Sequence, residues 1–263
     1  MKLQKMLIYG LLGGALAACD SIDENNRLIG PIEFETQKNI LIEDFTGQTC
    51  VNCPNAASTI HSLQEMYGKS HVIAVAIHGG FMSIPAPAGL ATEEGEAYVS
   101  HWGVEAFPIG QIDRTGGLTE YPSWSATAVK RLPMMTSIQI SVENSYDKSS
   151  RKLDIHTVID SEKDYNGKLQ LWLIEDHIIA YQTIPPGRPE PKYEHNHVFR
   201  KAINGLWGED IQLIADKFTD MNHSITLDEK WIPENVSVVA FVYNDEGVQQ
   251  TIIESAWKQQ EYY

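Results

Sequence analysis

The spacing of apolar residues divides the chain into a first part of buried strands and amphipathic helices and a second part of alternating strands. Apolar runs at Asn39–Phe45 and His71–Ile77 are typical of parallel strands that are buried on both faces. Between them, apolar residues recur at helical spacing from just after Pro54, and Gly68 stands where a helix C-cap belongs. This order predicts a right-handed strand–helix–strand crossover.

Beyond the crossover, the pattern predicts helices near Thr92–Trp102 and Ser123–Leu132 and a short strand at Ile109–Asp113. After Pro133 the period of the apolar residues changes from 3.6 to 2, which is typical of antiparallel strands with one buried face. The Pro-rich segment Thr183–Tyr193 is expected to be a surface loop.

The N-terminal residues have the three parts of a secretory signal peptide. Lys2 and Lys5 precede the apolar run Met6–Leu16, and Leu16-Ala17-Ala18-Cys19 matches the lipobox of bacterial lipoproteins. The apolar run is too short for a retained transmembrane helix. We expect cleavage before Cys19 and lipidation of its thiol, so that acyl chains anchor the mature protein to a membrane.

These patterns predict four segments: a signal peptide at 1–18, a lipidated N-terminus and linker at 19–37, an α/β domain at 38–135, and a mainly antiparallel β domain at 136–263. We interpret the last as an Ig-like β-sandwich. With 43% hydrophobic and 21% charged residues, the composition is that of a globular protein. The net charge of −15 argues against nucleic acid as a partner.

Cys50 and Cys53 remain as a pair once lipidation has used Cys19. An oxidising envelope compartment allows a disulfide between them, but this disulfide closes too small a loop to stabilise the fold appreciably. A zinc site needs further Cys or His ligands, and no second pair at the right spacing follows. We therefore expect redox chemistry, active or vestigial, and no metal or other cofactor.

The motif Cys50-Val51-Asn52-Cys53 stands between a buried strand and an amphipathic helix. Unpaired N–H groups and the dipole at a helix N-terminus favour a thiolate, so we expect Cys50 to be the nucleophile that attacks disulfides. Cys53, one turn further on, would attack the resulting mixed disulfide and release the reduced substrate.

The strand Ile40–Phe45, followed after four residues by the CxxC motif and a helix, resembles the thioredoxin family. In that family an acid at the place of Asp44 is a buried carboxylate that helps to move a proton to or from the resolving cysteine. The resemblance assigns this role to Asp44, with Glu43 as a competing candidate.

The loop Gly103–Pro108 resembles the cis-proline loop of the same family, which implies that Phe107 and Pro108 line the site. The sequence departs from the family pattern around the motif. Thr49 replaces the usual Trp, Val51-Asn52 replaces Gly-Pro, and Pro54 follows the second cysteine.

Over a longer stretch, the chain resembles the 28-kDa outer-membrane-protein family of Bacteroidetes lipoproteins, in which a β-rich domain follows a thioredoxin-like domain. The segments that carry this resemblance are His195–Arg200 and Val238–Tyr243. It implies a lipid-anchored location at the outer membrane, on the periplasmic face or at the cell surface.

Histidines offer two further candidate sites. His195 and His197 share a face if their run is a strand, and His177, with either of the two acids before it, would complete a metal site; ordinary polar strand residues are the favoured interpretation. His78 ends a predicted parallel strand, where α/β proteins place ligand-binding residues, but a hydrogen-bonded histidine at the rim is the simpler expectation.

Two functions are compatible with the sequence. The first is a thiol–disulfide oxidoreductase that acts on envelope or surface proteins through Cys50 and Cys53. The second is a non-enzymatic surface binding protein or adhesin that uses the same scaffold for partner recognition, because a fold does not fix a function. An oxidoreductase needs an accessible Cys50 of low pKa, whereas a binding protein does not.

Overall fold

The computed structural model describes residues 37–257, which form one compact unit. The predicted signal peptide, Cys19 and all but the last residue of the predicted linker lie outside them. None of the helices in this range is long and apolar enough to cross a membrane.

The first elements are the predicted strand–helix–strand crossover. β1 (Ile40–Thr46) and β2 (Val72–His78) pair in parallel, and α1 (Cys53–Tyr67) connects them. Both strands are almost entirely buried, as their continuous apolar runs predict. The helix ends at Gly68, whose φ of 91° suits a residue without a Cβ atom.

The remaining elements of the first part flank this crossover. They are α2 (Glu93–His101), β3 (Ile109–Ile112), the short 3-10 helix η2 (Tyr121–Ser123) and α3 (Trp124–Arg131). β3 pairs antiparallel with β1. Apolar side chains of α1 and α3 pack on one face of β1, and those of α2 pack on the other face.

The second part is β-rich, as predicted. Its elements are β4 (Ile138–Asp147), β5 (Lys152–Ser161), β6 (Tyr165–Glu175), β7 (Ile178–Ile184), β8 (Arg188–His195), β9 (Val198–Ala202), β10 (Glu209–Leu213), β11 (Thr219–Thr226), the 3-10 helix η3 (Pro233–Asn235), β12 (Val236–Asn244) and β13 (Gly247–Ser255). A three-stranded sheet of order β11-β5-β4 packs over an apolar core that it shares with β6 and β12.

One sheet crosses both parts of the chain. It has eight strands in the order β13-β12-β6-β9-β2-β1-β3, with β10 paired to β6. β9 makes the junction, because it pairs antiparallel with β6 and meets β2 in parallel at Ala76 and Val198. The predicted boundary after residue 135 falls between α3 and β4, and it stays a prediction.

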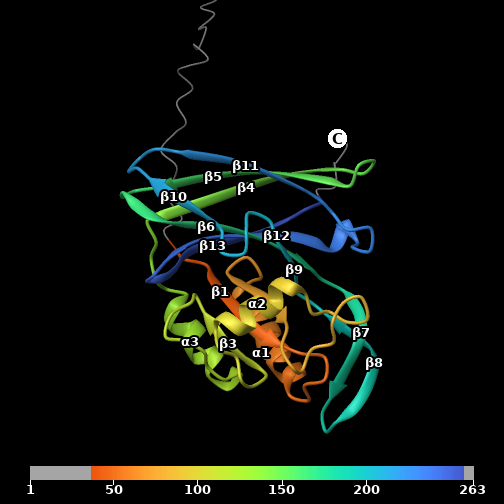
Figure 1. Cartoon of the computed structure of the whole chain (residues 1–263). Coiled ribbons are helices and arrows are strands. Elements are labelled where there is room, and N and C mark those ends of the chain that lie inside the picture. Colours follow the sequence, from red (N-terminus) through yellow and green to blue (C-terminus); the bar gives the residue numbers. More distant parts are fainter. Residues whose placement is uncertain (1–36, 258–263) are drawn as a thin grey trace, which may run out of the picture. The chain divides into compact units, whose positions relative to one another are not determined.

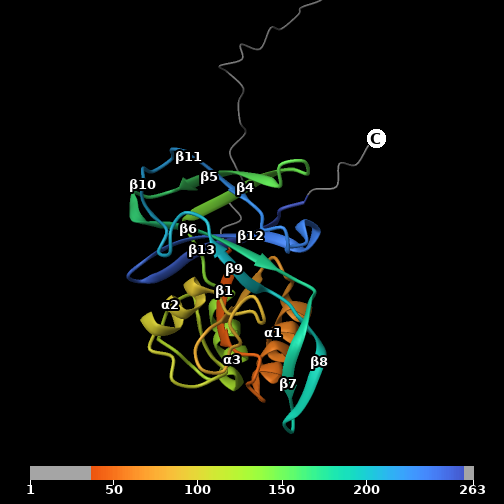
Figure 2. The same ribbon diagram turned by 45° about the vertical axis from the view of Figure 1, so that its right-hand side comes forward.

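The segment expected to be a Pro-rich surface loop is a β-hairpin instead. β7 and β8 pair with each other and form a separate two-stranded sheet, which lies beside α1 in both views (Figures 1 and 2). Prolines are tolerated in β8 because it is an edge strand, where a missing N–H group removes little pairing. The expectation of a loop was therefore wrong, although much of β8 is exposed.

A buried ion pair lies on the α2 side of the sheet. The Glu43 carboxylate of β1 accepts hydrogen bonds from the Arg114 guanidinium at 2.9–3.2 Å and from the Gln111 amide at 2.9 Å. Both charged side chains are almost fully buried. Aromatic rings surround the guanidinium, including those of Phe241 at 4.9 Å and Tyr243 at 4.5 Å.

We predict that Glu43→Ala lowers the free energy of unfolding by about 3–5 kcal/mol, because it leaves the Arg114 charge buried without its partner. Urea unfolding followed by circular dichroism measures the change. The exposed Glu229→Ala is the control and is expected to stay within about 0.5 kcal/mol of the unchanged protein. A loss from Glu43→Ala as small as that of the control would contradict the prediction.

Candidate functional site

A disulfide joins Cys50 and Cys53, whose Cα atoms lie 5.5 Å apart. Cys53 is the first residue of α1, and its backbone N–H group lies 3.1 Å from the Cys50 sulfur, to which it donates. Pro54 suits the first turn of a helix, where an N–H group has no partner within the helix. The departure from the family pattern at Pro54 is thus compatible with the predicted position of the motif.

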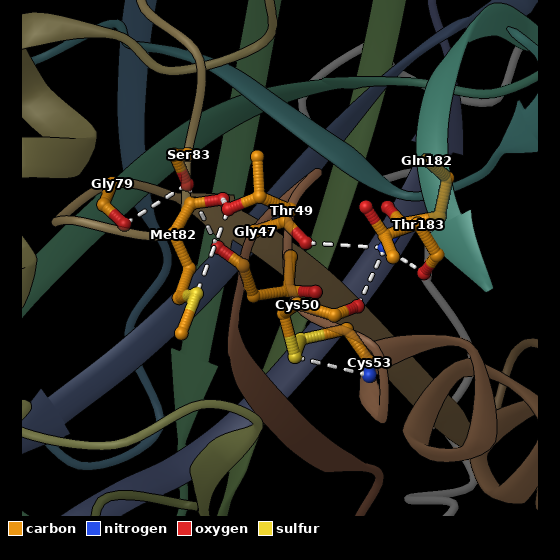
Figure 3. Close-up of a disulfide and its surroundings, with 10 residues drawn as sticks. Gly47, Thr49, Cys50, Cys53, Gly79, Met82, Ser83, Gln182 and Thr183 are labelled. Carbon is orange, nitrogen blue, oxygen red and sulfur yellow. Dashed lines mark hydrogen bonds between the residues drawn. A yellow bond between two sulfur atoms is a disulfide. The ribbon is translucent and has the colours of Figure 1, made fainter. Parts of the chain in front are cut away.

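The loop after β2 covers one side of the motif. The backbone N–H and the hydroxyl of Thr49 both donate to the Met82 carbonyl oxygen at 2.9 Å (Figure 3). Gly47 lies so close to this loop that a Cβ atom would come within 2.5 Å of the same oxygen. A side chain at position 47 would therefore push the loop away from the motif.

The β7–β8 hairpin covers the other side. The Gln182 side-chain amide donates to the carbonyl oxygens of Cys50 at 2.8 Å and Gly47 at 3.2 Å (Figure 3). The backbone N–H of Thr183 donates to the Gln48 carbonyl oxygen at 2.8 Å. As a result, Cys50 and Cys53 are each only 3% exposed.

Sequence reasoning missed Gln182. One polar residue inside a short apolar run carries no motif, and the following Pro-rich residues were expected to be a loop. Its role depends on a hairpin that places Gln182, which lies 132 residues after Cys50 in the sequence, against the motif.

The predicted proline loop reaches the same surroundings. The peptide bond between Phe107 and Pro108 is cis, and Pro108 immediately precedes β3, which pairs with β1. The Phe107 ring packs edge-on against Phe81 at 5.4 Å between centroids. Phe107 therefore contacts the loop that covers Cys50.

The two candidate acids point to opposite faces of β1, because successive residues of a strand alternate. Glu43 lies on the α2 side and is neutralised by Arg114. Asp44 lies on the α1 side, is 2% exposed, and has no hydrogen-bond partner for its buried Oδ1 atom among residues 37–257. Burial raises the pKa of the Asp44 carboxyl from 3.8 to about 8. Of the two candidate acids, Asp44 is therefore the one that lies on the same side of the sheet as α1, which begins at the CxxC motif.

A cavity of about 380 Å³ lies between α1, the sheet and the β7–β8 hairpin. Asp44 and Cys53 both line it, together with His78, Gln182 and His195. This volume is within the range of small-molecule sites. The lining of the cavity contains the predicted acid, the predicted resolving cysteine and all four candidate histidines, since His177 and His197 also belong to it.

The histidines are not arranged as expected. His78 is 3% exposed and its Nδ1 atom has no hydrogen-bond partner in the described part of the chain, so the expectation of a hydrogen-bonded rim residue was wrong. His195 ends β8, whereas His197 lies beyond it with a φ of 59°, so they do not share a strand face. His177 pairs with Glu194 at 2.7 Å. Within residues 37–257, no group of three or more His, Cys, Asp and Glu residues is placed to hold a metal ion.

Asp44 generates a prediction about stability and pH. Its pKa is raised on folding, so the folded protein holds a proton that the unfolded chain loses, and stability falls as the pH rises from about 4 to about 8. We expect oxidised Asp44→Asn to gain stability relative to the unchanged protein by up to about 1.4 kcal/mol per pH unit across this window. Urea unfolding at several pH values measures the difference, and Asp245→Asn in an exposed turn is the control. A difference that does not change with pH would contradict the prediction.

Gln182 generates a prediction about access to the disulfide. Each hydrogen bond contributes roughly 0.5–1.5 kcal/mol, so loss of the two that reach the CxxC loop should make opening easier. We expect Gln182→Ala to increase the rate at which dithiothreitol reduces the disulfide about tenfold. Alkylation of samples quenched at successive times, with mass spectrometry, measures this rate. Gln139→Ala in β4 is the matched control. An unchanged rate would show that the hairpin does not limit access.

Of the solved structures, HBP35 of Porphyromonas gingivalis is similar over 86% of this chain and 80% of its own, with 15% identity and a TM-score of 0.66, and thus shares the fold. A domain of the outer membrane lipoprotein Omp28 from the same organism is 21% identical over 46% of this chain and 88% of its own, with a TM-score of 0.33. No curated protein sequence matches at a significant level.

The sequence profile of the outer membrane protein Omp28 family matches residues 95–258. This range covers more than half of the chain and includes both segments that carried the resemblance. The outer-membrane, lipid-anchored location expected from the sequence agrees with this family. The chain belongs to the Omp28 family of outer membrane proteins.

Proposed function

We propose that this outer-membrane lipoprotein exchanges disulfides with envelope or surface proteins through Cys50 and Cys53. The observation that carries the proposal is Asp44, a buried carboxyl that lines the same cavity as Cys53 and whose Oδ1 atom has no hydrogen-bond partner in the described part of the chain. Burying a polar group without a partner lowers the stability of the fold, and a disulfide with a purely structural role does not require such a group. Proton transfer to and from Cys53, in contrast, requires a nearby acid such as the Asp44 carboxyl.

The proposal includes a thioredoxin-like module at residues 38–135. It is supported by the parallel crossover of β1 and β2, the CxxC motif at the start of α1 and the antiparallel β3 after Pro108. Residues 136–263 would form the Ig-like module. The β7–β8 hairpin, which belongs to that second module, would help to select the partner because it lies against the motif.

The exchange proceeds in two displacements. In the first, the Cys50 thiolate attacks one sulfur of a substrate disulfide, so that a mixed disulfide forms and the other substrate thiolate leaves. The helix N-terminus and the Cys53 N–H group stabilise the Cys50 thiolate. In the second, Cys53 gives its proton to the Asp44 carboxylate and attacks the Cys50 sulfur. The Cys50–Cys53 disulfide forms and the second substrate thiolate leaves, so the substrate gains the two electrons that the protein loses.

The same steps in reverse oxidise a dithiol substrate. The raised pKa of Asp44 suits both directions, because a group with a pKa of about 8 exchanges a proton readily near neutral pH. The cover over the motif adds a requirement: a partner must displace the Met82 loop or the hairpin before it reaches Cys50.

Burial of the disulfide favours the second candidate function, a non-enzymatic surface binding protein. Cys50 and Cys53 are each 3% exposed, and the hydrogen bonds around them hold the covering segments in place. In that case the disulfide only rigidifies the loop beneath the hairpin, and partner binding would persist when both cysteines are replaced by Ser.

The pKa of Cys50 separates the two functions. The experiment follows the rate of iodoacetamide alkylation across pH in the detergent-solubilised Cys53→Ser protein, with and without Gln182→Ala to open the cover. We expect a midpoint well below the ordinary thiol value of about 8.5, because the helix N-terminus stabilises the thiolate. A midpoint at or above that value, or no reaction even in the opened variant, would leave the binding protein as the function.

A further inference from the structure

The alternation of residues on β1 and β2 places three polar side chains on the cavity side of the sheet. Asp44 lies opposite Ala76 in the parallel register, and Thr46 lies opposite His78. All four residues line the cavity. Because Ala76 is small, space remains beside the Asp44 carboxyl, and the next residue on that face of β2 is His78.

The rings of His78, at the end of β2, and His195, at the end of β8, lie next to each other in the lining of the cavity. Their ring centroids lie 5.5 Å apart at an interplanar angle of 70°. His195 comes from the end of β8, and its Nε2 atom lies 3.3 Å from the Tyr181 carbonyl oxygen. The pair therefore links the sheet to the hairpin that covers the motif.

Both imidazoles are neutral near neutral pH. Burial lowers the pKa of His78 well below 6.5, and the positive charge of Arg200, like that of His195 when it is protonated, acts in the same direction. Burial also lowers the pKa of His195, to about 4, although its hydrogen bond to Tyr181 opposes the change. A neutral imidazole has one nitrogen that donates and one that accepts, so it can take a proton on one side and release another on the other side.

Three of the other titratable groups that line the cavity, His177, Glu194 and His197, have polar partners of their own. His177 and Glu194 pair with each other at 2.7 Å, and His197 lies 3.1 Å from both the Gln64 amide oxygen and the Asp176 carboxylate. The remaining titratable groups that line the cavity are His61 of α1, Lys69 of the following loop and Tyr193 of β8.

Three buried polar atoms of the cavity lining have no hydrogen-bond partner among residues 37–257. Nδ1 of His197 lies 3.1 Å from the Asp176 carboxylate, within ion-pair distance. Oδ1 of Asp44 and Nδ1 of His78 have no ion-pair partner in this part of the chain either. A cavity of about 380 Å³ has room for several water molecules, each of which occupies about 30 Å³ in the liquid. Water between Asp44 and His78 would give both atoms a partner and join them in one hydrogen-bonded chain.

We propose that His78, together with His195, relays protons between Asp44 and the mouth of the cavity during disulfide exchange. This assignment rests on the proposed function and makes both histidines positioning residues that act through Asp44. When Cys53 attacks the mixed disulfide, its proton passes to the Asp44 carboxylate. The Asp44 carboxyl then passes a proton through water to one nitrogen of His78, whose other nitrogen releases one toward His195 and solvent. Asp44 returns to the carboxylate, and no other bond changes.

The experiment separates the two displacements in time. The reduced full chain in detergent is mixed with the chromogenic disulfide dithiobis(nitrobenzoate). Attack by Cys50 releases a first thionitrobenzoate, and attack by Cys53 releases a second. We expect His78→Gln to slow the second release at least about tenfold and to change its pH profile, because a positioned proton-transfer group contributes roughly 10²–10⁴-fold. The first release is expected to keep its rate, and added imidazole is expected to restore the second.

His223→Gln is the control, because this histidine is also largely buried but pairs with Glu209 and lies on β11, outside the lining of the cavity. Circular dichroism checks that each variant is folded; if His78→Gln is not, His195→Gln is read in the same way. A second release with the unchanged rate and pH profile in a folded variant overturns the relay while the exchange function stands. If the protein with all its histidines releases no second thionitrobenzoate, the exchange function fails and the relay fails with it.

Discussion

The arrangement of the molecule depends on one short strand, β9, which pairs with β2 of the first part and β6 of the second part. This pairing makes one eight-stranded sheet out of elements that the chain forms in two separate stretches. The β7–β8 hairpin leaves the sheet after β6 and returns to it at β9, so the junction holds the hairpin beside α1. Without this junction the motif would have no cover and the cavity would have no outer wall.

The second constraint is the alternation of side chains along β1. It separates two neighbouring carboxylates by the thickness of a sheet and gives them different chemistry. Glu43 meets Arg114 in an aromatic environment and serves stability. Asp44 meets no cation among residues 37–257, so burial alone raises its pKa to about 8. One strand thus supplies a structural ion pair and a group suited to proton transfer.

The covered disulfide connects the two candidate functions. Cys50 and Cys53 have the position of a reactive pair at a helix N-terminus, yet the Met82 loop and Gln182 keep both almost fully buried. If the pair exchanges disulfides as proposed, this arrangement would couple exchange to the binding of a partner that opens the cover.

The sequence alone determined what depends on neighbouring residues: the crossover of β1, α1 and β2, the position of the CxxC motif at a helix start, and the β-rich second part. Apolar spacing and turn residues encode these features locally. It could not rank Asp44 against Glu43, because the face that meets α1 depends on packing. It also did not reveal Gln182, the hairpin cover or the partnership of His78 with His195, which meet across more than 100 residues of chain. Only the tertiary structure decided these, since such contacts form when distant strands join one sheet and leave no periodic pattern in the sequence.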